Sequence, residues 1–155
     1  MKKTTNKGFS MVELIIVIAI MAILAAALAP SLIKYINKSR LSTDIQTGTS
    51  IVSSVNAAMA VEKANDECQK TYAGKVVTVD QTNIDPSDDF GKEFWSVMGV
   101  STVKGKSKKD LAGTTLSNQV FLLSIDKSTD AVTVWYDTQD NDHMIAPTTG
   151  TALAE

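Results

Sequence analysis

The sequence contains one cysteine and one histidine in 155 residues, and this scarcity excludes several kinds of site. Cys68 has no second cysteine with which to form an internal disulfide, so we expect a small, partly buried apolar residue. His143 alone cannot supply the ligands of a zinc site, and no cluster of titratable residues accompanies it to form a catalytic triad. We therefore predict no enzyme, no cofactor and no metal site, with His143 in a surface loop.

Charge of either sign is also limited. Fifteen basic and seventeen acidic residues give a formal net charge of −2, and charged residues make up 21% of the chain. No basic surface for nucleic acid is indicated. No internal repeat is visible, and the length allows one folded domain with an appendage.

An uncharged apolar run from Leu14 to Ala29 is the strongest feature that is present. Three lysines precede it, and Glu13 stands at its leading edge. Together with residues 9–12 the run reaches the roughly 20 residues that span a bilayer. Its many β-branched residues alone would suggest a strand, but a lone strand cannot satisfy its backbone in lipid, so we predict a hydrophobic helix over residues 9–33. A carboxylate in hydrocarbon costs about 2.5–3.5 kcal/mol or more, so Glu13 should have a partner.

The order of these residues resembles the start of type IV prepilins and pseudopilins, which carry a class III leader. The resemblance rests on a short basic leader that ends in Gly8, then Phe9, then Glu13, then the apolar helix. Pro30 also falls where many pilins have a proline. The resemblance covers about thirty residues and implies that residues 1–8 are a leader removed by a membrane-embedded prepilin peptidase. It further implies cleavage between Gly8 and Phe9, N-methylation of Phe9, and a role for Glu13 in filament assembly.

The same resemblance implies a function and a location. The chain would be a pilin, a single-pass protein of the cytoplasmic membrane before assembly and part of an extracellular type IV pilus afterwards, serving adhesion, motility or secretion. Its partners would be other copies of itself, the prepilin peptidase, an assembly ATPase and a platform protein. Two alternatives remain: a pseudopilin of a type II secretion or DNA-uptake machine, and a membrane-anchored binding module. An ordinary secretory signal cleaved near residues 25–27 and an uncleaved anchor are further readings of the N-terminus.

Residues 34–155 are predicted to form the globular domain, beginning with an amphipathic helix over residues 34–62. Apolar residues and one glycine recur there at spacings of three and four, which is typical of a helix with one buried stripe. Gly48 either lets a partner approach closely or marks a bend, and Pro30 should kink or locally melt the helix before it. The members of the stripe are Leu41, Ile45, Gly48, Val52, Val55 and Met59.

The rest of the domain indicates a small antiparallel sheet, so the fold class is α+β. Residues 119–125 and 131–136 alternate apolar and polar side chains around a polar turn, which predicts a hairpin. Phe121, Leu123 and Ile125 alternate with Val120, Leu122 and Ser124 in the first strand, and Val132, Val134 and Tyr136 with Thr133, Trp135 and Asp137 in the second; one face should pack on the stripe of the helix. Residues 75–79 predict a strand, 90–97 a short helix and 64–70 a loop or short helix, and the end from position 147 should be loose. Trp95 and Trp135 are expected in the core.

Two weaker patterns are similar to ligand sites but lack residues that such sites need. One is a possible calcium site, whose oxygen ligands would come from Asp137, Asp140 and Asp142; major pseudopilins of type II secretion bind calcium near their C-termini. The segment that holds these aspartates lacks the glycine and final glutamate of an EF-hand loop. Gly105-Lys106-Ser107 is similar to the end of a phosphate-binding loop, but Val100 occupies the position that needs a glycine. The lysines around this tripeptide are better interpreted as a solvated loop.

Overall fold

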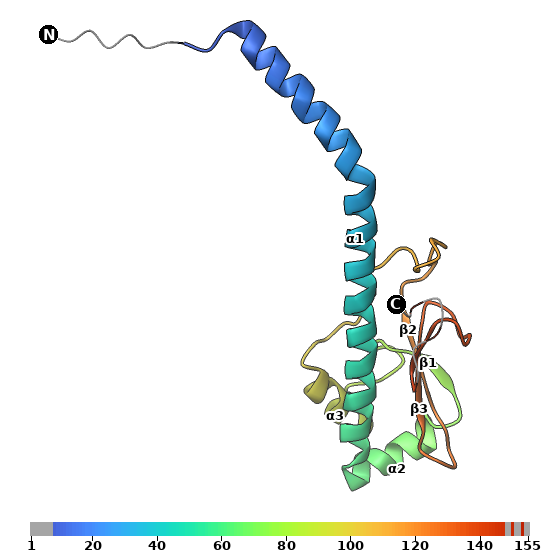
Figure 1. The fold of residues 1–155 in the computed structure, drawn as a ribbon. Coiled ribbons are helices and arrows are strands. Elements are labelled where there is room, and N and C mark those ends of the chain that lie inside the picture. The colour runs from blue at the N-terminus through green and yellow to red at the C-terminus, as the bar shows by residue number, and fades with distance from the viewer. Residues whose placement is uncertain (1–7, 148–149, 151–152, 154–155) are drawn as a thin grey trace, which may run out of the picture. The chain divides into compact units, whose positions relative to one another are not determined.

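The structure is a computed structural model that describes residues 8–147, 150 and 153. The chain divides into two compact units, Met1–Ile36 and Asn37–Glu155, and each is described separately. As predicted, the fold combines a long N-terminal helix with a small antiparallel sheet (Figure 1). In chain order the elements are α1 (Met11–Met59), α2 (Glu62–Thr71), β1 (Val76–Thr78), α3 (Asp89–Met98), β2 (Phe121–Ile125), β3 (Val132–Tyr136) and β4 (Met144–Ala146).

Helix α1 runs through Pro30 without a break. Proline has no N–H, so the carbonyl of Ala26 loses its donor within the helix. The turn before Pro30 is rich in alanine and leucine, which are strong helix formers and hold the helix despite the missing bond. Of the two outcomes expected at Pro30, a kink or local melting, the melting does not occur.

The C-terminal end of α1 differs from the prediction. The helix expected to reach position 62 ends at Met59. The amide of Ala60 is shared between the carbonyls of Asn56 and Ala57, and the amide of Val61 donates to the carbonyl of Ala58, three residues back, so the last turn is tightened. Val61 is extended, with φ −91° and ψ 118°, and α2 begins directly after it. The segment left open as a loop or short helix is this second helix.

The sheet has the order β1-β2-β3-β4, and every neighbouring pair is antiparallel. The predicted hairpin is confirmed: Phe121 pairs with Tyr136 and Leu123 with Val134, and all four side chains are buried. The carboxylate of Asp126 stabilises the turn, because it accepts the amides of Ser128 and Thr129, both at 2.9 Å. Strand β4 was not predicted.

The buried stripe of α1 is offset from the predicted one. Ile51 is fully buried, whereas Val52 is only partly buried and packs at the edge of the core with Ile45 and Met59. Two polar residues, Asp44 and Ser54, lie on the buried side, and counting apolar residues alone had left them out. The buried positions of α1 are Leu41, Asp44, Gly48, Ile51, Ser54, Val55 and Ala58.

Gly48 allows close approach between α1 and β4. A Cβ atom built on Gly48 would lie 2.4 Å from Cδ1 of Ile145. Of the two explanations offered by the sequence, close approach is therefore the one that this contact supports. The core also contains Leu153, so the expectation of a loose C-terminal end is wrong at that residue.

Helices α2 and α3 add an aromatic cluster to the core. The rings of Tyr72, Phe90 and Phe94 pack in sequence, with centroids 5.0 and 6.1 Å apart. Trp95 is buried as predicted and donates from Nε1 to the carbonyl of Ile84 at 2.8 Å. Trp135 is only half-buried, because it alternates with Val134 and Tyr136 and points to the other face of the sheet.

Candidate processing and assembly site

Exposed apolar surface is concentrated at the N-terminal end of the described chain. Every residue from 8 to 36 is exposed. Of the 22 large apolar residues that are exposed in the described part of the chain, seventeen lie between Phe9 and Ile36. Among the described residues, α1 alone is long and apolar enough to cross a membrane. Such a surface is unfavourable in water, since burying one leucine or isoleucine side chain contributes about 1.5–3 kcal/mol. The segment therefore needs lipid or other apolar helices around it.

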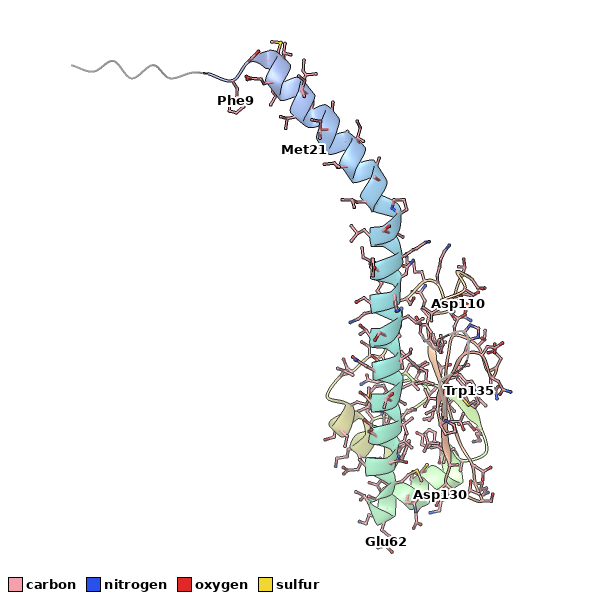
Figure 2. The ribbon with its side chains drawn as sticks, viewed as in Figure 1. Phe9, Met21, Glu62, Asp110, Asp130 and Trp135 are labelled. Carbon is pink, nitrogen blue, oxygen red and sulfur yellow. The ribbon has the colours of Figure 1, made fainter. Side chains whose placement is uncertain are left out.

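The peptide bond between Gly8 and Phe9 lies outside α1. Residues 8–10 have no regular secondary structure, and the Phe9 side chain is 88% exposed (Figure 2). A Cβ atom built on Gly8 would meet no other atom within 4 Å. The bond is thus accessible to an enzyme, and the fold itself does not require glycine at position 8.

Ser10 and Glu13 form the N-terminal cap of α1. The backbone amide of Ser10 donates to Oε2 of Glu13 at 2.8 Å, and Oγ of Ser10 accepts the amide of Val12 at 3.4 Å. This reciprocal pair is a variant of the capping box, in which Ser10 accepts the amide of the second helical residue instead of the third, and two amides at the helix start are satisfied. Our sequence reasoning missed it, although Ser-x-x-Glu before an apolar run is its signature.

The capping box holds Glu13 beside Phe9. The carboxylate of Glu13 binds the amide of Ser10, and Phe9 is the residue directly before Ser10. A negative charge in the first turn also interacts favourably with the helix dipole. Glu13 is thus hydrogen-bonded to the residue that follows Phe9. Pro30 is not part of this arrangement, because seventeen residues of helix, about 26 Å, separate it from Glu13.

Two of the three aspartates considered for calcium, Asp137 and Asp140, accept hydrogen bonds from backbone amides. Asp137 is buried, and its carboxylate accepts the amides of Ser117 at 2.9 Å and of Gln119 at 2.7 Å. Asp140 accepts the amide of His143 at 2.8 Å. Among the described residues, no group of three or more His, Cys, Asp or Glu side chains is placed to hold a metal ion.

His143 is less exposed than a surface loop would imply. Its Nδ1 lies 2.8 Å from Asp140, its Nε2 lies 3.9 Å from the buried carboxylate of Asp110, and only 16% of its side chain is accessible. Burial acts to raise the pKa of Asp140, but hydrogen bonds from Thr138 and His143 outweigh it and lower that pKa. His143 therefore links two loops, which one histidine in a polar segment did not reveal.

The tripeptide that is similar to a phosphate-binding loop binds a carboxylate of the same chain. The amides of Lys106 and Ser107 donate to Asp44 of α1, at 2.9 and 2.7 Å. A Cβ atom on Gly105 would lie 2.0 Å from the hydroxyl of Tyr136, and that hydroxyl donates to the carbonyl of Ser107 at 2.9 Å. Burial, followed by the charge of Asp44, raises the pKa of Tyr136. Because both amides already bind Asp44, they are not available to a phosphate. The tripeptide instead attaches its loop to α1.

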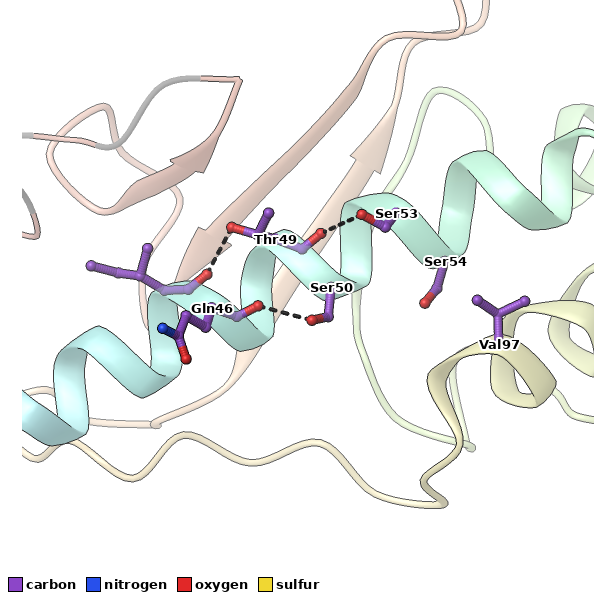
Figure 3. A pocket seen from close by; sticks show the side chains of 7 residues that line it. Gln46, Thr49, Ser50, Ser53, Ser54 and Val97 are labelled. Carbon is purple, nitrogen blue, oxygen red and sulfur yellow. Dashed lines mark hydrogen bonds between the residues drawn. The ribbon is translucent and has the colours of Figure 1, made fainter.

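One open groove, of about 520 Å³, lies between α1 and Val97 of α3 (Figure 3). None of its lining side chains is ionisable. The hydroxyls of Thr49, Ser50 and Ser53 donate to carbonyls four residues earlier in α1, at 3.0, 3.0 and 3.1 Å. These hydroxyls have no adjacent base among the lining residues, so the groove offers no acid–base chemistry. Its lining is Ile45, Gln46, Thr49, Ser50, Ser53, Ser54 and Val97.

Comparison with known families identifies the N-terminal segment. Residues 3–29 match the family model of the prokaryotic N-terminal methylation motif. The match includes Gly8, Phe9, Ser10 and Glu13, and it confirms the class III leader inferred from the order of these residues. It ends before the globular unit begins. No solved structure matches the chain.

Proposed function

We propose that this type IV pilin-like chain is a filament subunit, made as a precursor and polymerised after removal of its leader. The observation that carries the proposal is the methylation motif over residues 3–29, whose part from Met11 onward lies on an apolar helix, together with the exposure of every residue from 8 to 36. A motif of this type fits a structural protein rather than an enzyme. The unit Asn37–Glu155 would then form the outside of the filament.

Processing is the first step of the proposed pathway. A prepilin peptidase would cut between Gly8 and Phe9, where the chain is exposed and not helical, and would methylate the new amine of Phe9. Cleavage removes the three lysines of the leader, and methylation leaves the positive charge of the amine in place. The mature chain would thus start with one cation at the edge of an apolar helix.

The apolar helix has two successive environments in this proposal. Before assembly it would hold the subunit in the cytoplasmic membrane, with a length near the roughly 20 residues that span a bilayer. An assembly ATPase and a platform protein would then move the subunit into the filament, where the helices of many copies exchange lipid for one another. Small residues between Met21 and Ala29 allow such helices to pack closely.

Glu13 would set the register of an incoming subunit. In a dry bundle its carboxylate must be neutral or paired, and the amine of Phe9 is the cation nearest in the chain. An axial shift of about four residues, roughly 6 Å, would bring the amine of a neighbouring copy to the same carboxylate. A buried pair of this kind adds little net stability but penalises a wrong register, since it would leave two charges unpaired. Pro30 is proposed to assist assembly as well.

The mature N-terminus tests this proposal directly. The chain would be isolated from membranes and from sheared cell-surface material, and its N-terminal peptide analysed by mass spectrometry. We expect N-methylated Phe9 in both fractions and filaments that bind antibodies against the globular unit in electron microscopy. An intact Met1, or a terminus near Ala27, would refute the processing step. A methylated Phe9 without surface filaments would favour a pseudopilin, which shares the motif.

A further inference from the structure

Four lysines stand on one loop that the fold holds in place. The loop connects α3 to β2, and its lysine side chains are exposed. Hydrogen bonds from Lys106 and Ser107 to Asp44, and from Tyr136 to Ser107, fix its backbone. Within the part of the chain that the structure describes, none of the four ammonium groups forms an ion pair. The four are Lys104, Lys106, Lys108 and Lys109.

This loop belongs to a larger basic region, which we call the basic pole and define as residues 37–44 and 99–118. It contains six basic and two acidic residues, a formal charge of +4. Both acids are buried and used internally: Asp44 binds the loop, and Asp110 accepts the amide of Thr114 at 2.7 Å. Asp140, which His143 links to Asp110, is an exposed carboxylate beside the pole, but the exposed lysines outnumber it and the charge that reaches solvent is positive.

The opposite end of the same unit is acidic. We define the acidic pole as residues 62–72, 85–93 and 126–130, which contain nine acidic and four basic residues, a formal charge of −5. Its segments are joined by hydrogen bonds from Gln69 to Asp130 and from Tyr72 to Asp88. Within the unit Asn37–Glu155, Figure 2 shows Glu62 and Asp130 together at one end and Asp110 toward the other.

We infer that the basic pole of one subunit docks on the acidic pole of a second copy of this chain. The inference rests on the proposed function, because a polymer needs two complementary surfaces on each subunit. A contact between unlike poles is heterologous, so it leaves a free pole at each end and can repeat without closing. A symmetric contact would instead place like charges against each other.

The charges would select and orient the partner more than they would hold it. Exposed ion pairs are individually weak and are screened over about 10 Å at 0.1 M salt. Opposite poles nevertheless attract an incoming subunit in one orientation and repel the inverted one. The apolar helices would supply most of the cohesion. An anionic lipid surface would also attract the lysines, but it would leave the acidic pole without a role.

The test uses full-length chains in the native host and measures the amount of filament that shearing releases. One variant reverses the basic pole, with Lys104, Lys106, Lys108 and Lys109 all changed to Glu. The second reverses the acidic pole, with Glu62, Asp66, Asp89 and Glu93 all changed to Lys. We expect each variant alone to lose at least about tenfold in filament yield. Co-expression of the two should restore most of it, because each then offers a pole that the other can bind.

A matched control makes the same change in net charge away from the basic pole. Changing Lys63, Lys70, Lys92 and Lys127 to Glu makes the acidic pole more acidic, so it should keep the yield near that of the parent chain. Wild-type yield from the basic-pole variant would overturn the inference, as would a loss that co-expression cannot restore. A parent chain that forms no filaments would instead refute the proposed function. Protection of the buried Cys68 thiol from alkylation would verify that each variant is folded.

Discussion

The carboxylate of Asp44 accepts the backbone amide of Ser107 at 2.7 Å, although 63 positions separate the two residues. Asp44 lies on the buried face of α1 and is only 1% exposed. The amide of Lys106 donates to the same carboxylate, so a loop with few apolar side chains is attached to the helix by charge-assisted hydrogen bonds. A buried charge is tolerated here because backbone donors satisfy it.

Replacing Asp44 should loosen this attachment in a graded way. Asp44→Ala leaves the buried amide of Ser107 without an acceptor, which costs about 1–3 kcal/mol, and removes the acceptor of the part-buried amide of Lys106 as well. Asp44→Asn keeps one acceptor oxygen and should cost less. Urea unfolding of the full chain in detergent, followed by the fluorescence of Trp95 and Trp135, measures the effect, since both tryptophans lie in the unit Asn37–Glu155. Equal midpoints for Asp44→Ala and the parent chain would contradict this role.

A methyl group at position 48 should destabilise the same unit. The added Cβ of Gly48→Ala would come within 2.4 Å of Ile145 Cδ1 and 2.8 Å of its Cγ2. Overpacking of this kind costs about 1–3 kcal/mol, whereas the better helix propensity of alanine returns about 1 kcal/mol. We therefore expect a net loss of stability in the same urea assay.

A double mutant identifies the cause of that loss. Ile145→Ala alone should also be destabilising, because it removes a buried side chain. If glycine is needed at position 48 because β4 approaches α1 there, the double mutant Gly48→Ala/Ile145→Ala should lose less unfolding free energy than the sum of the two single mutants. Strict additivity would show that the two positions do not share this space.

The thiol of Cys68 should be inert in the folded chain. Burial, with the charges of Asp130 and Asp88 nearby, raises its pKa from 9.0 to about 12. Only the thiolate reacts with alkylating reagents, so we expect alkylation at pH 8 at least a hundredfold slower in buffer than in urea. The pKa of the Cys68 thiol is higher in the folded chain than in the unfolded chain, so the neutral thiol favours folding. This contribution to stability is complete below pH 9 and is lost as the pH rises from 9 to 12. Alkylation at the same rate with and without urea would show that Cys68 is not enclosed.

Ser10 and Glu13 can be separated by substitution. Ser10→Ala removes one half of the capping box but leaves the Glu13 carboxylate, so we expect processing and near-normal filament yield. Glu13→Gln keeps an oxygen that can accept the amide of Ser10 but loses the charge, and Glu13→Ala loses both. If pairing with the Phe9 amine drives assembly, both Glu13 variants should be processed yet form few filaments. Abundant filaments from Glu13→Gln would instead assign Glu13 to helix capping alone.

Elements with strong local patterns were predictable from the sequence. The hairpin of β2 and β3 follows from alternation around a polar turn, and its register places Phe121 opposite Tyr136. The leader could be identified because its residues are contiguous. The capping box could have been found in the same way, since Ser10 and Glu13 are three positions apart.

Features that depend on distant partners were not predictable. Strand β4 has three residues, too few for a pattern, and it forms only because β3 is there to pair with it. The stripe of α1 was misplaced for a similar reason, because Asp44 is buried only through amides that lie 62 and 63 positions away. Gly105 is explained by the Tyr136 ring above it, and no local pattern indicates that contact.

The hydroxyl groups along α1 affect how easily this face of the helix can be buried. From Thr43 to Ser53, five serine and threonine side chains donate to the carbonyl one turn back, so this face already carries its own acceptors. When water leaves such a face, no hydroxyl proton is left without an acceptor, and the usual penalty for drying a polar surface is reduced. Burial of this part of α1, from Thr43 to Ser53, against another surface should therefore cost little in lost hydrogen bonds.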